Sequence, residues 1–276
     1  MTSKAPSALE PLCGHASAGL RADGYRLRCG ACGSFFDLDS AALEFRYDAS
    51  YPVLRSHFDP EVGAMKVRSL ERWLRAANVD PTGSVVCEVG FGGAYCLRWL
   101  AQRATQVFGI ETVEANLAHA RSLGLANLIA FEACRDPLPR PVDLWLFLDS
   151  FEHLPDPDRF VSWLAASSAA RARVLLVAPE ADSPSERLLG RLWPHRLPDH
   201  RFHWSRDGIE ALYRSHGFRR VSEFAPTKYV SGAMVVNHLV RTLPVLRPLS
   251  GTARLVGGLR MRFNLGEMGL LLERGV

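Results

Sequence analysis

VVCEVGFGGAY, at residues 85–95, is the stretch of sequence that decides the fold of this chain. A β-branched run containing one acid, Glu88, leads directly into three glycines within four positions, and an amphipathic segment follows at once. This order predicts a buried strand, a tight turn and the start of a helix. Gly90 permits the turn, and Gly92 or Gly93 lets a ligand approach the backbone. Because a helix N-terminus offers free N–H donors and a positive dipole end, we expect a nucleotide-like ligand here.

Two classes of cofactor enzyme use such a turn. Dinucleotide enzymes carry G-x-G-x-x-G, followed about 20 residues later by an acid for the ribose. Here the spacing is Gly90-x-Gly92-x-Ala94, with Glu88 two residues before the first glycine. This segment resembles the E/D-x-G-x-G-x-G/A turn of class I S-adenosylmethionine (SAM) methyltransferases, with Ala94 in place of the third glycine. The turn by itself leaves both cofactor classes open.

Length and composition indicate an ordinary globular protein. The chain has 276 residues and a mass of 30.6 kDa, enough for one α/β domain and a small appendage. Hydrophobic residues make up 47% and charged residues 22% of the chain, as in typical soluble domains. All but three of the 33 basic residues are arginine, which more often reflects genome composition than nucleic-acid binding. We therefore expect no nucleic-acid partner.

Three features of the sequence bear on where the protein is located in the cell. No run of about 20 apolar residues without charge is present, so we expect no membrane span. Residues 1–11 lack the charged-then-apolar layout of a signal peptide. The six cysteines are spread unevenly, as in a reduced protein rather than one held by disulfides. A cytoplasmic location is expected.

Three cysteines and one histidine near the start of the chain form two pairs of candidate metal ligands. Cys29 and Cys32 belong to a C-x-x-C-G turn, and Cys13-Gly14-His15 precedes it by 16 residues. Two ligand pairs on two turns are typical of a zinc ribbon, in which four N/S ligands make a closed structural site. The C-x-H spacing departs from C-x-x-C, so a three-cysteine site stays open. Redox activity and unliganded cysteines are the alternatives, although no thioredoxin-like βα context surrounds the pair.

The strands after the glycine turn carry further candidates at their ends. A second strand over 106–110 ends in Glu111, whose carboxylate can accept hydrogen bonds from both ribose hydroxyls. A third strand over 128–132 places Cys134 at its carboxyl edge, where it would form a wall of the base pocket. The apolar run 142–148 predicts a central parallel strand. Ligands of doubly wound sheets lie outside these carboxyl ends.

A specific resemblance begins where the fourth strand ends. D-x-x-E-H-L-x-D-P, at residues 149–157, is similar to the corresponding motif of small-molecule SAM methyltransferases related to ubiquinone and menaquinone biosynthesis enzymes. The same family carries H-x-x-x-[FW]-[ST] before a later helix, and His200, Trp204 and Ser205 match it. The resemblance covers about residues 60–276, apart from an insert. It implies an α/β, Rossmann-like, doubly wound sheet of seven mostly parallel strands.

The resemblance also implies a cofactor and a reaction. SAM would donate a methyl group to oxygen or carbon of a small-molecule acceptor. His153 and His200 are the candidate bases, and relatives with an E-H pair here use a divalent metal, so that Glu152 and His153 could instead be ligands. The residues expected to bind the cofactor are Glu88, Gly90, Phe91, Gly92, Gly93, Glu111, Thr112, Ala133, Cys134 and Asp149.

These observations divide the chain into two parts. Residues 1–46 form a zinc-ribbon-like module with a spacer, and 47–276 form the methyltransferase domain, with an apolar, arginine-rich insert at 226–264. The insert suits a substrate lid, a homodimer surface or a membrane-surface helix, and lid or dimer packing is favoured. Two other functions stay open: an RNA methyltransferase that uses the ribbon for recognition, and a non-catalytic SAM-fold interaction protein.

Glu111→Ala tests the role of the second strand end. We expect SAM binding to weaken by about 1.5–3 kcal/mol, the range for hydrogen bonds to a charged group. Isothermal titration of the parent and the variant with SAM measures the difference. Unchanged affinity would exclude Glu111 from the cofactor site.

Overall fold

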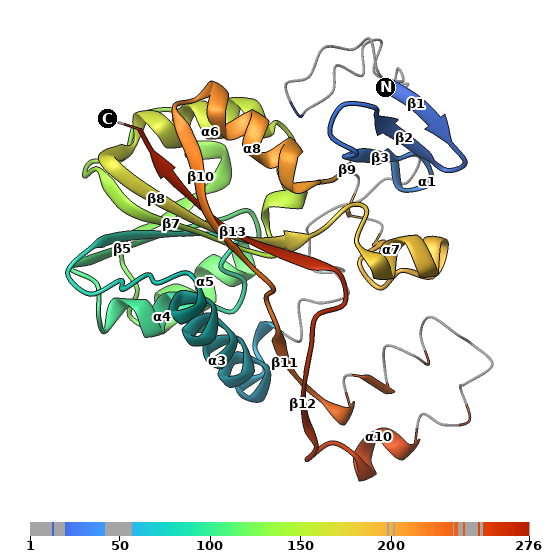
Figure 1. Ribbon diagram of the computed structural model, residues 1–276. Helices are drawn as coiled ribbons and strands as arrows, with labels where there is room; N and C mark the ends of the chain where they lie inside the picture. Colours follow the sequence, from blue (N-terminus) through green and yellow to red (C-terminus); the bar gives the residue numbers. More distant parts are fainter. Residues whose placement is uncertain are drawn as a thin grey trace, which may run out of the picture.

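The computed structural model describes residues 13, 20–41, 57–197, 199–200, 202–233, 235–236, 240, 248 and 251–275. Its centre is a sheet of seven strands in the order β10-β13-β8-β7-β4-β5-β6 (Figure 1). In chain order these strands are β4 (Val85–Val89), β5 (Gln106–Glu111), β6 (Leu128–Ala130), β7 (Val142–Leu148), β8 (Ser168–Pro179), β10 (Phe218–Phe224) and β13 (Glu267–Arg274).

The sheet is parallel except at one strand. β4 pairs in parallel with β5 and β7, and these pair in parallel with β6 and β8. β13 lies antiparallel between β8 and β10. The expected sheet of seven mostly parallel strands is therefore confirmed, and the all-parallel arrangement of a dinucleotide-binding domain is not found.

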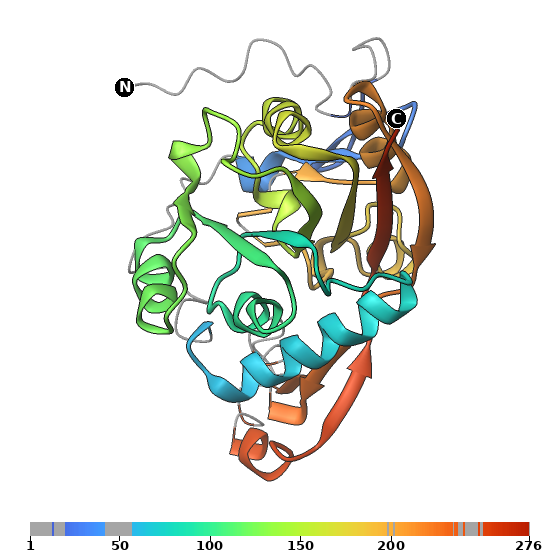
Figure 2. The ribbon, with the colours of Figure 1, turned by 90° about the vertical axis from the view of Figure 1, so that its left-hand side faces the viewer.

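Helices cover both faces of the sheet (Figures 1 and 2). One face carries α3 (Pro60–Ala76), α4 (Tyr95–Ala101) and α5 (Glu114–Ser122), and the other carries α6 (Pro157–Ala166) and α8 (Arg206–Ser215). Asp59, Asp156 and Ser205 cap α3, α6 and α8, because their side-chain oxygens accept hydrogen bonds from backbone N–H groups of the first turn. None of the helices among the described residues is both long and apolar enough to cross a membrane.

β4 and β7 form the centre of the core. Every side chain of β4 is buried, as are those of β7 apart from Asp143 and, in part, Leu148. The Asp143 carboxylate accepts a hydrogen bond of 2.8 Å from the backbone N–H of Val85, at the start of β4. β4 and β7 therefore lie in fixed positions relative to each other, with their carboxyl ends side by side. A ligand at this edge of the sheet can contact the ends of both strands.

The N-terminal module is a small sheet that is completed by a strand from the other part of the chain. β1 (Leu20–Asp23), β2 (Arg26–Cys29) and β3 (Phe35–Asp37) are antiparallel, and α1 (Leu38–Ala41) follows. The fourth strand, β9 (Phe202–His203), pairs with β3. The module thus shares its sheet with the segment that precedes α8.

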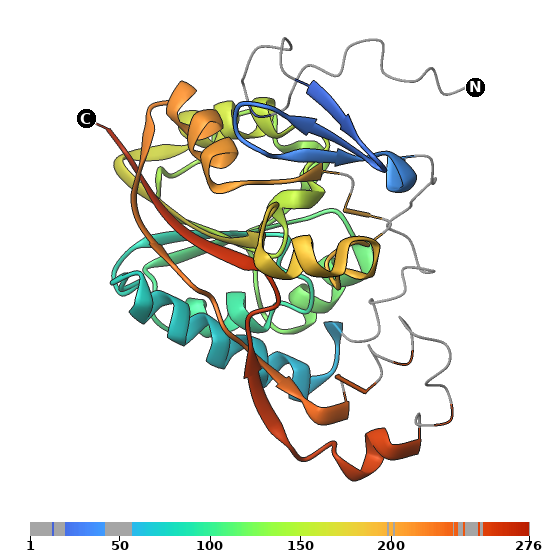
Figure 3. The same cartoon turned by 45° about the vertical axis from the view of Figure 1, so that its right-hand side comes forward.

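The insert forms an arm beside α3. β11 (Lys228–Ser231) and β12 (Arg260–Phe263) pair in an antiparallel ladder, and α10 (Thr252–Leu255) lies between them in the chain. The arm extends away from the central sheet at the lower right of Figures 1 and 3. Most of the apolar positions between 234 and 250 lie outside the described residues, so the choice between lid and dimer surface stays a prediction.

Two predicted strand boundaries were wrong. The third strand ends at Ala130 rather than at Glu132, because η2 (Phe131–Ala133) is a 3-10 turn. The apolar run of the fifth strand predicts Arg173–Ala178, followed by Pro179, but β8 starts five residues earlier, at Ser168. Its first residues are small or charged and half-exposed, so no apolar run marks them, but Ser168 is fixed by a 2.8 Å hydrogen bond from Trp145 Nε1. The remaining short helices are η3 (Phe151–His153), α7 (Pro184–Leu189) and η4 (Gly190–Leu192).

Gly109 in β5 is a close-packing site whose substitution tests this architecture. A Cβ atom there would lie 2.5 Å from Leu97 Cδ2 and 2.8 Å from the Phe91 ring, so α4 or the glycine turn must move. Gly109→Ala should lower the free energy of unfolding by about 1–3 kcal/mol, as overpacking does. Gly251→Ala, with nothing within 4 Å, is the control in urea denaturation. Equal stability of both variants would contradict this packing.

Candidate active site

The glycine turn after β4 adopts a backbone that only small residues allow. Gly90 has φ 72°, and a Cβ atom there would lie 2.5 Å from the Cβ of Ser150. A Cβ on Gly93 would lie 1.7 Å from the carbonyl oxygen of His57. Ala94, the residue in place of the third glycine, has φ 59° and is the N-cap of α4. The turn is therefore held between Ser150, two residues after β7, and His57, three residues before α3.

Glu111 ties this turn to the end of β5. Its carboxylate accepts hydrogen bonds from the backbone N–H groups of Gly92 at 2.9 Å, Thr112 at 2.8 Å and Val113 at 3.0 Å. The side-chain amide of Asn116 donates a fourth at 3.2 Å. These donors hold the carboxylate at the carboxyl edge of the sheet, in the position predicted for a ribose acceptor.

A first cavity, here named the Glu111 cavity, has a volume of about 350 Å³. The predicted residues Gly90, Gly92, Glu111, Thr112, Asp149 and His153 line it. Ala133 and Cys134 do not; Phe131 and Glu132 take that place, because β6 ends early and the 3-10 turn brings residues 131 and 132 to the edge. Cys134 instead lines a separate pocket with Trp163. The sequence-based placement of the base pocket was two residues too late.

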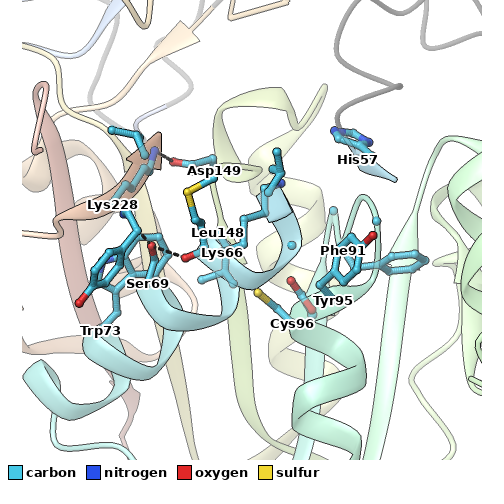
Figure 4. Close-up of a pocket in the computed structure, with 18 residues that line it drawn as sticks. His57, Lys66, Ser69, Trp73, Phe91, Tyr95, Cys96, Leu148, Asp149 and Lys228 are labelled. Carbon is cyan, nitrogen blue, oxygen red and sulfur yellow. Dashed lines mark hydrogen bonds and ion pairs between the residues drawn. The ribbon is translucent and has the colours of Figure 1, made fainter. Parts of the chain in front are cut away.

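A second cavity, here named the Glu88 cavity, has a volume of about 230 Å³ and lies between α3, the glycine turn and β11 (Figure 4). The predicted Glu88, Phe91 and Gly93 line it, together with apolar side chains of α3 such as Met65 and Trp73. Both cavities share the residues His57, Lys66, Gly90, Leu148 and Asp149. They therefore meet at the carboxyl ends of β4 and β7.

Glu88 is a buried carboxyl group on the wall of the second cavity. Burial raises its pKa to about 8, an effect that Lys66 opposes and Glu111 reinforces. Among the described residues, no hydrogen-bond partner is found for Glu88 Oε2. An acid in this state gains charge when a cation arrives beside it.

The junction of the cavities also contains a cation that the sequence analysis missed. Lys228 of β11 lies with its Nζ 2.8 Å from Asp149 Oδ1 (Figure 4). The same Nζ lies 2.5 Å from Glu267 Oε1. Burial alone would lower the pKa of Lys228, but the two carboxylates raise it above its ordinary value. Asp149 itself has φ 58°. Lys228 was missed because it lies in the insert, outside the family resemblance.

Two more residues at the junction carried no signal in the sequence. Lys66 is one of several charged residues on the outer side of an amphipathic helix. His57 lies three residues before that helix, and its Nδ1 lies 3.3 Å from Asn116 Oδ1. Burial lowers the pKa of His57 and nearby Lys66 lowers it further. Only the fold brings both side chains to the glycine turn.

The two predicted bases, His153 and His200, lie side by side, but only one of them lines a cavity. The rings of His153 and His200 have centroids 4.6 Å apart. His153 lines the Glu111 cavity, whereas His200 is buried behind it and lines neither of the two cavities. Burial, with His153 and two further histidines nearby, lowers the pKa of His200 well below its ordinary value. His200 is therefore a neutral imidazole and a weak base.

Glu152 and these two histidines form a cluster of candidate metal ligands. One ligand atom from each of Glu152, His153 and His200 lies within 4.8 Å of the others. Among the described residues, neither carboxylate oxygen of the buried Glu152 has a hydrogen-bond partner. His200 Nδ1 lies 2.8 Å from the carbonyl oxygen of His195, which orients its Nε2 toward Glu152. One carboxylate and two imidazoles suit a divalent transition metal.

The cysteines of the N-terminal module form a second cluster. Cys13, Cys29 and Cys32 are buried, and their Sγ atoms lie within 4.8 Å of one another. Hydrogen bonding with Cys13 lowers the pKa of Cys32 to about 4, against the effect of burial. The fourth predicted ligand, His15, lies outside the described residues. Three convergent thiols, one of them acidic, suit Zn²⁺.

Known proteins match both the sequence and the fold. The family model described as "Methyltransferase domain" matches residues 64–223, more than half of the 276-residue chain. Ubiquinone biosynthesis O-methyltransferase of Pseudomonas fluorescens (strain SBW25) is 33% identical over 108 residues, which are 37% of this chain and 43% of that protein. The enzyme of the same name from Stutzerimonas stutzeri (strain A1501) is 32% identical over 133 residues, 45% of this chain and 51% of the relative. The match thus spans about half or less of these relatives.

Solved structures agree in fold. A putative methyltransferase from Bacillus halodurans C-125 has a TM-score of 0.54 at 16% identity, covering 74% of this chain and 97% of that one. A putative sarcosine dimethylglycine methyltransferase from Galdieria sulphuraria has a TM-score of 0.51 at 15% identity, covering 78% and 88%. With the family match over residues 64–223, these findings show that the chain belongs to the methyltransferase domain family and has the class I SAM-dependent methyltransferase fold.

Proposed function

We propose that the protein transfers the methyl group of SAM to an oxygen or carbon atom of a small-molecule acceptor. The observation that carries this proposal is the meeting of two cavities at Gly90 and Asp149. Methyl transfer needs the donor and acceptor atoms in line and near contact, rather than covalent help from the protein. Two cavities with a common junction can hold one reactant each. The names of the curated relatives favour an oxygen acceptor.

The lining residues suggest which reactant occupies which cavity. The adenosyl group belongs in the Glu111 cavity, where Glu111 would accept hydrogen bonds from the ribose. The methionine part would then cross the junction at Gly90, and its ammonium and sulfonium charges would lie near Glu88 and Asp149. The acceptor would take the apolar part of the Glu88 cavity, beside Trp73. Each placement follows from the charge and polarity of the walls.

His153 is the candidate base for a hydroxyl acceptor. Its ring lines the Glu111 cavity and not the Glu88 cavity, so the acceptor hydroxyl would have to extend through the junction at Asp149 to reach it. His200 suits a different role. Since it is neutral and buried, it fits a metal ligand better than a base, together with Glu152 and His153. A divalent ion held there would act as a Lewis acid on an acceptor oxygen.

We also propose that Cys13, Cys29 and Cys32 hold Zn²⁺, with His15 as the candidate fourth ligand. A closed site of this kind has no open position for substrate, so its role is structural. The metal would fold a module that is too small to form a core by itself.

Titration with three ligands tests the proposed cofactor. SAM and S-adenosylhomocysteine should bind the purified protein, and NAD should not. Isothermal titration calorimetry measures all three under one set of conditions. Failure of both sulfur-containing ligands to bind would contradict the proposed function, whatever the acceptor.

Glu88 makes cofactor binding dependent on pH in a defined direction. Because its pKa is about 8 in the free protein, a cationic ligand must displace a proton from it below that pH. Affinity for S-adenosylhomocysteine should therefore rise from about pH 5 to about pH 8, by at most about tenfold per unit. The folded protein should lose stability over the same range, since the unfolded chain ionises Glu88 and the folded one does not.

Glu88→Gln should remove both pH dependences. Titration of the ligand itself is common to parent and variant, so the difference between their pH profiles reports the protein. Glu71→Gln, on α3, is the matched control and should behave as the parent. Identical profiles for the parent and Glu88→Gln would show that Glu88 does not change its protonation when the cofactor binds.

A further inference from the structure

The N-terminal module contacts the catalytic part of the chain by strand pairing. β3 pairs with β9 in the register Phe35 with His203 and Phe36 with Phe202. The rings of Phe35 and His203 stack with centroids 4.6 Å apart. β9 follows His200 by two residues. The position of His200 is thus tied to a strand whose partner belongs to the module.

The cysteine cluster lies at the same contact. Cys32 Sγ lies 3.3 Å from Ser34 Oγ, which in turn accepts a 2.9 Å hydrogen bond from the backbone N–H of Ser205. The two serine hydroxyls are 3.0 Å apart, and Ser205 Oγ caps α8 by accepting from Gly208 N. A Cβ on Gly208 would lie 3.2 Å from Cys32 Sγ, so the thiol is packed directly against the first turn of α8.

This arrangement suits a charged metal centre. Three thiolates and one Zn²⁺ leave a net negative charge, which the positive end of a ten-residue helix stabilises. The cysteines also belong to the main hydrophobic core, together with Trp204 and Ile209 of the catalytic part. The surroundings of the cysteine cluster are therefore shared between the two parts of the chain.

Ion pairs also join the module to the chain upstream of β9. Arg196 donates to Asp37 at 2.6 Å and to Asp39 at 2.6 Å, both on the module. Arg28 of β2 lies 2.5 Å from Asp182, just before α7. The module thus holds the segment from 182 to 205 at several points, and this segment contains His195, His200 and His203.

We propose that metal bound at Cys13, Cys29 and Cys32 fastens the module to the catalytic domain and thereby positions the His200 segment, which packs against His153 at the wall of the Glu111 cavity. Cys32, Ser34 and Ser205 are the positioning residues of this contact. No described residue of the module lines either cavity, so the metal leaves cofactor binding itself unchanged. The effect on catalysis rests on the proposed function, whereas the ordering of residues 195–208 by metal does not.

Hydrogen exchange of the full chain tests the fastening without an acceptor. Zinc-loaded and chelator-stripped protein are compared by mass spectrometry. Stripping should speed exchange by about tenfold or more in peptides covering 26–37 and 195–208, and leave 85–92 and 106–116 unchanged. The dissociation constant of S-adenosylhomocysteine should stay within about threefold. Faster exchange in 26–37 alone would overturn the proposal, as would loss of protection over the whole chain.

Ser34→Ala separates fastening from metal binding, and it serves as a second test if the chelator-stripped protein does not stay folded. The variant keeps all three cysteines, so it should retain bound zinc while exchange rises at 203–208. Ser215→Ala, at the other end of α8, is the matched control and should leave 203–208 unchanged. Unchanged exchange at 203–208 in Ser34→Ala would contradict the role given to Ser34 and Ser205.

Imidazole signals report position rather than stability. In ¹⁵N-histidine spectra, zinc removal and Ser34→Ala should both shift the ring resonances of His200 and His203, while His119 on α5 stays fixed. Static signals of His200 and His203 would overturn the proposal. Failure of S-adenosylhomocysteine to bind even the zinc-loaded protein would instead contradict the proposed function, and the exchange result would still stand.

Discussion

The hydrogen bond from the backbone N–H of Gly92 to the carboxylate of Glu111 is the interaction on which the site depends. It joins the turn after β4 to the end of β5, so the two strand ends cannot move apart without breaking a charge-assisted bond. Gly90 packs on Ser150, which adds the end of β7 to the same unit. The cavity on each side of this unit exists because the three strand ends are held together.

Charge at this junction is arranged for a cationic ligand. Glu88 is buried without a partner on one oxygen among the described residues, and Asp149 faces the same space. The ammonium group of Lys228 compensates the negative charges of Asp149 and Glu267 in this partly buried place. The insert therefore contributes to the centre of the site through Lys228, near its beginning, although its arm extends away from the central sheet (Figure 1).

The parts of the fold and of the site that could be predicted from the sequence are those in which one local pattern determines one element. The turn at 90–93, Glu111 at the end of β5 and the apolar strand over 142–148 each follow from one short stretch of the chain, and the structure has them where the sequence predicts. The base pocket was misplaced at Ala133 and Cys134, because a short 3-10 turn has no apolar period that marks it. Lys228, His57 and β9 could not be predicted, since each reaches its partners only through contacts between distant segments. The pairing of β9 with β3, which adds a strand of the catalytic part to the sheet of the module, has no sequence signal at all.

A crystal structure of the complex with S-adenosylhomocysteine tests the central claim most directly. The account predicts the ribose at Glu111, the methionine amino group between Gly90 and Glu88, and the sulfur facing the Glu88 cavity. A ligand bound elsewhere would contradict it. So would a sulfur atom turned away from the Glu88 cavity, because the two cavities would then not bring donor and acceptor together.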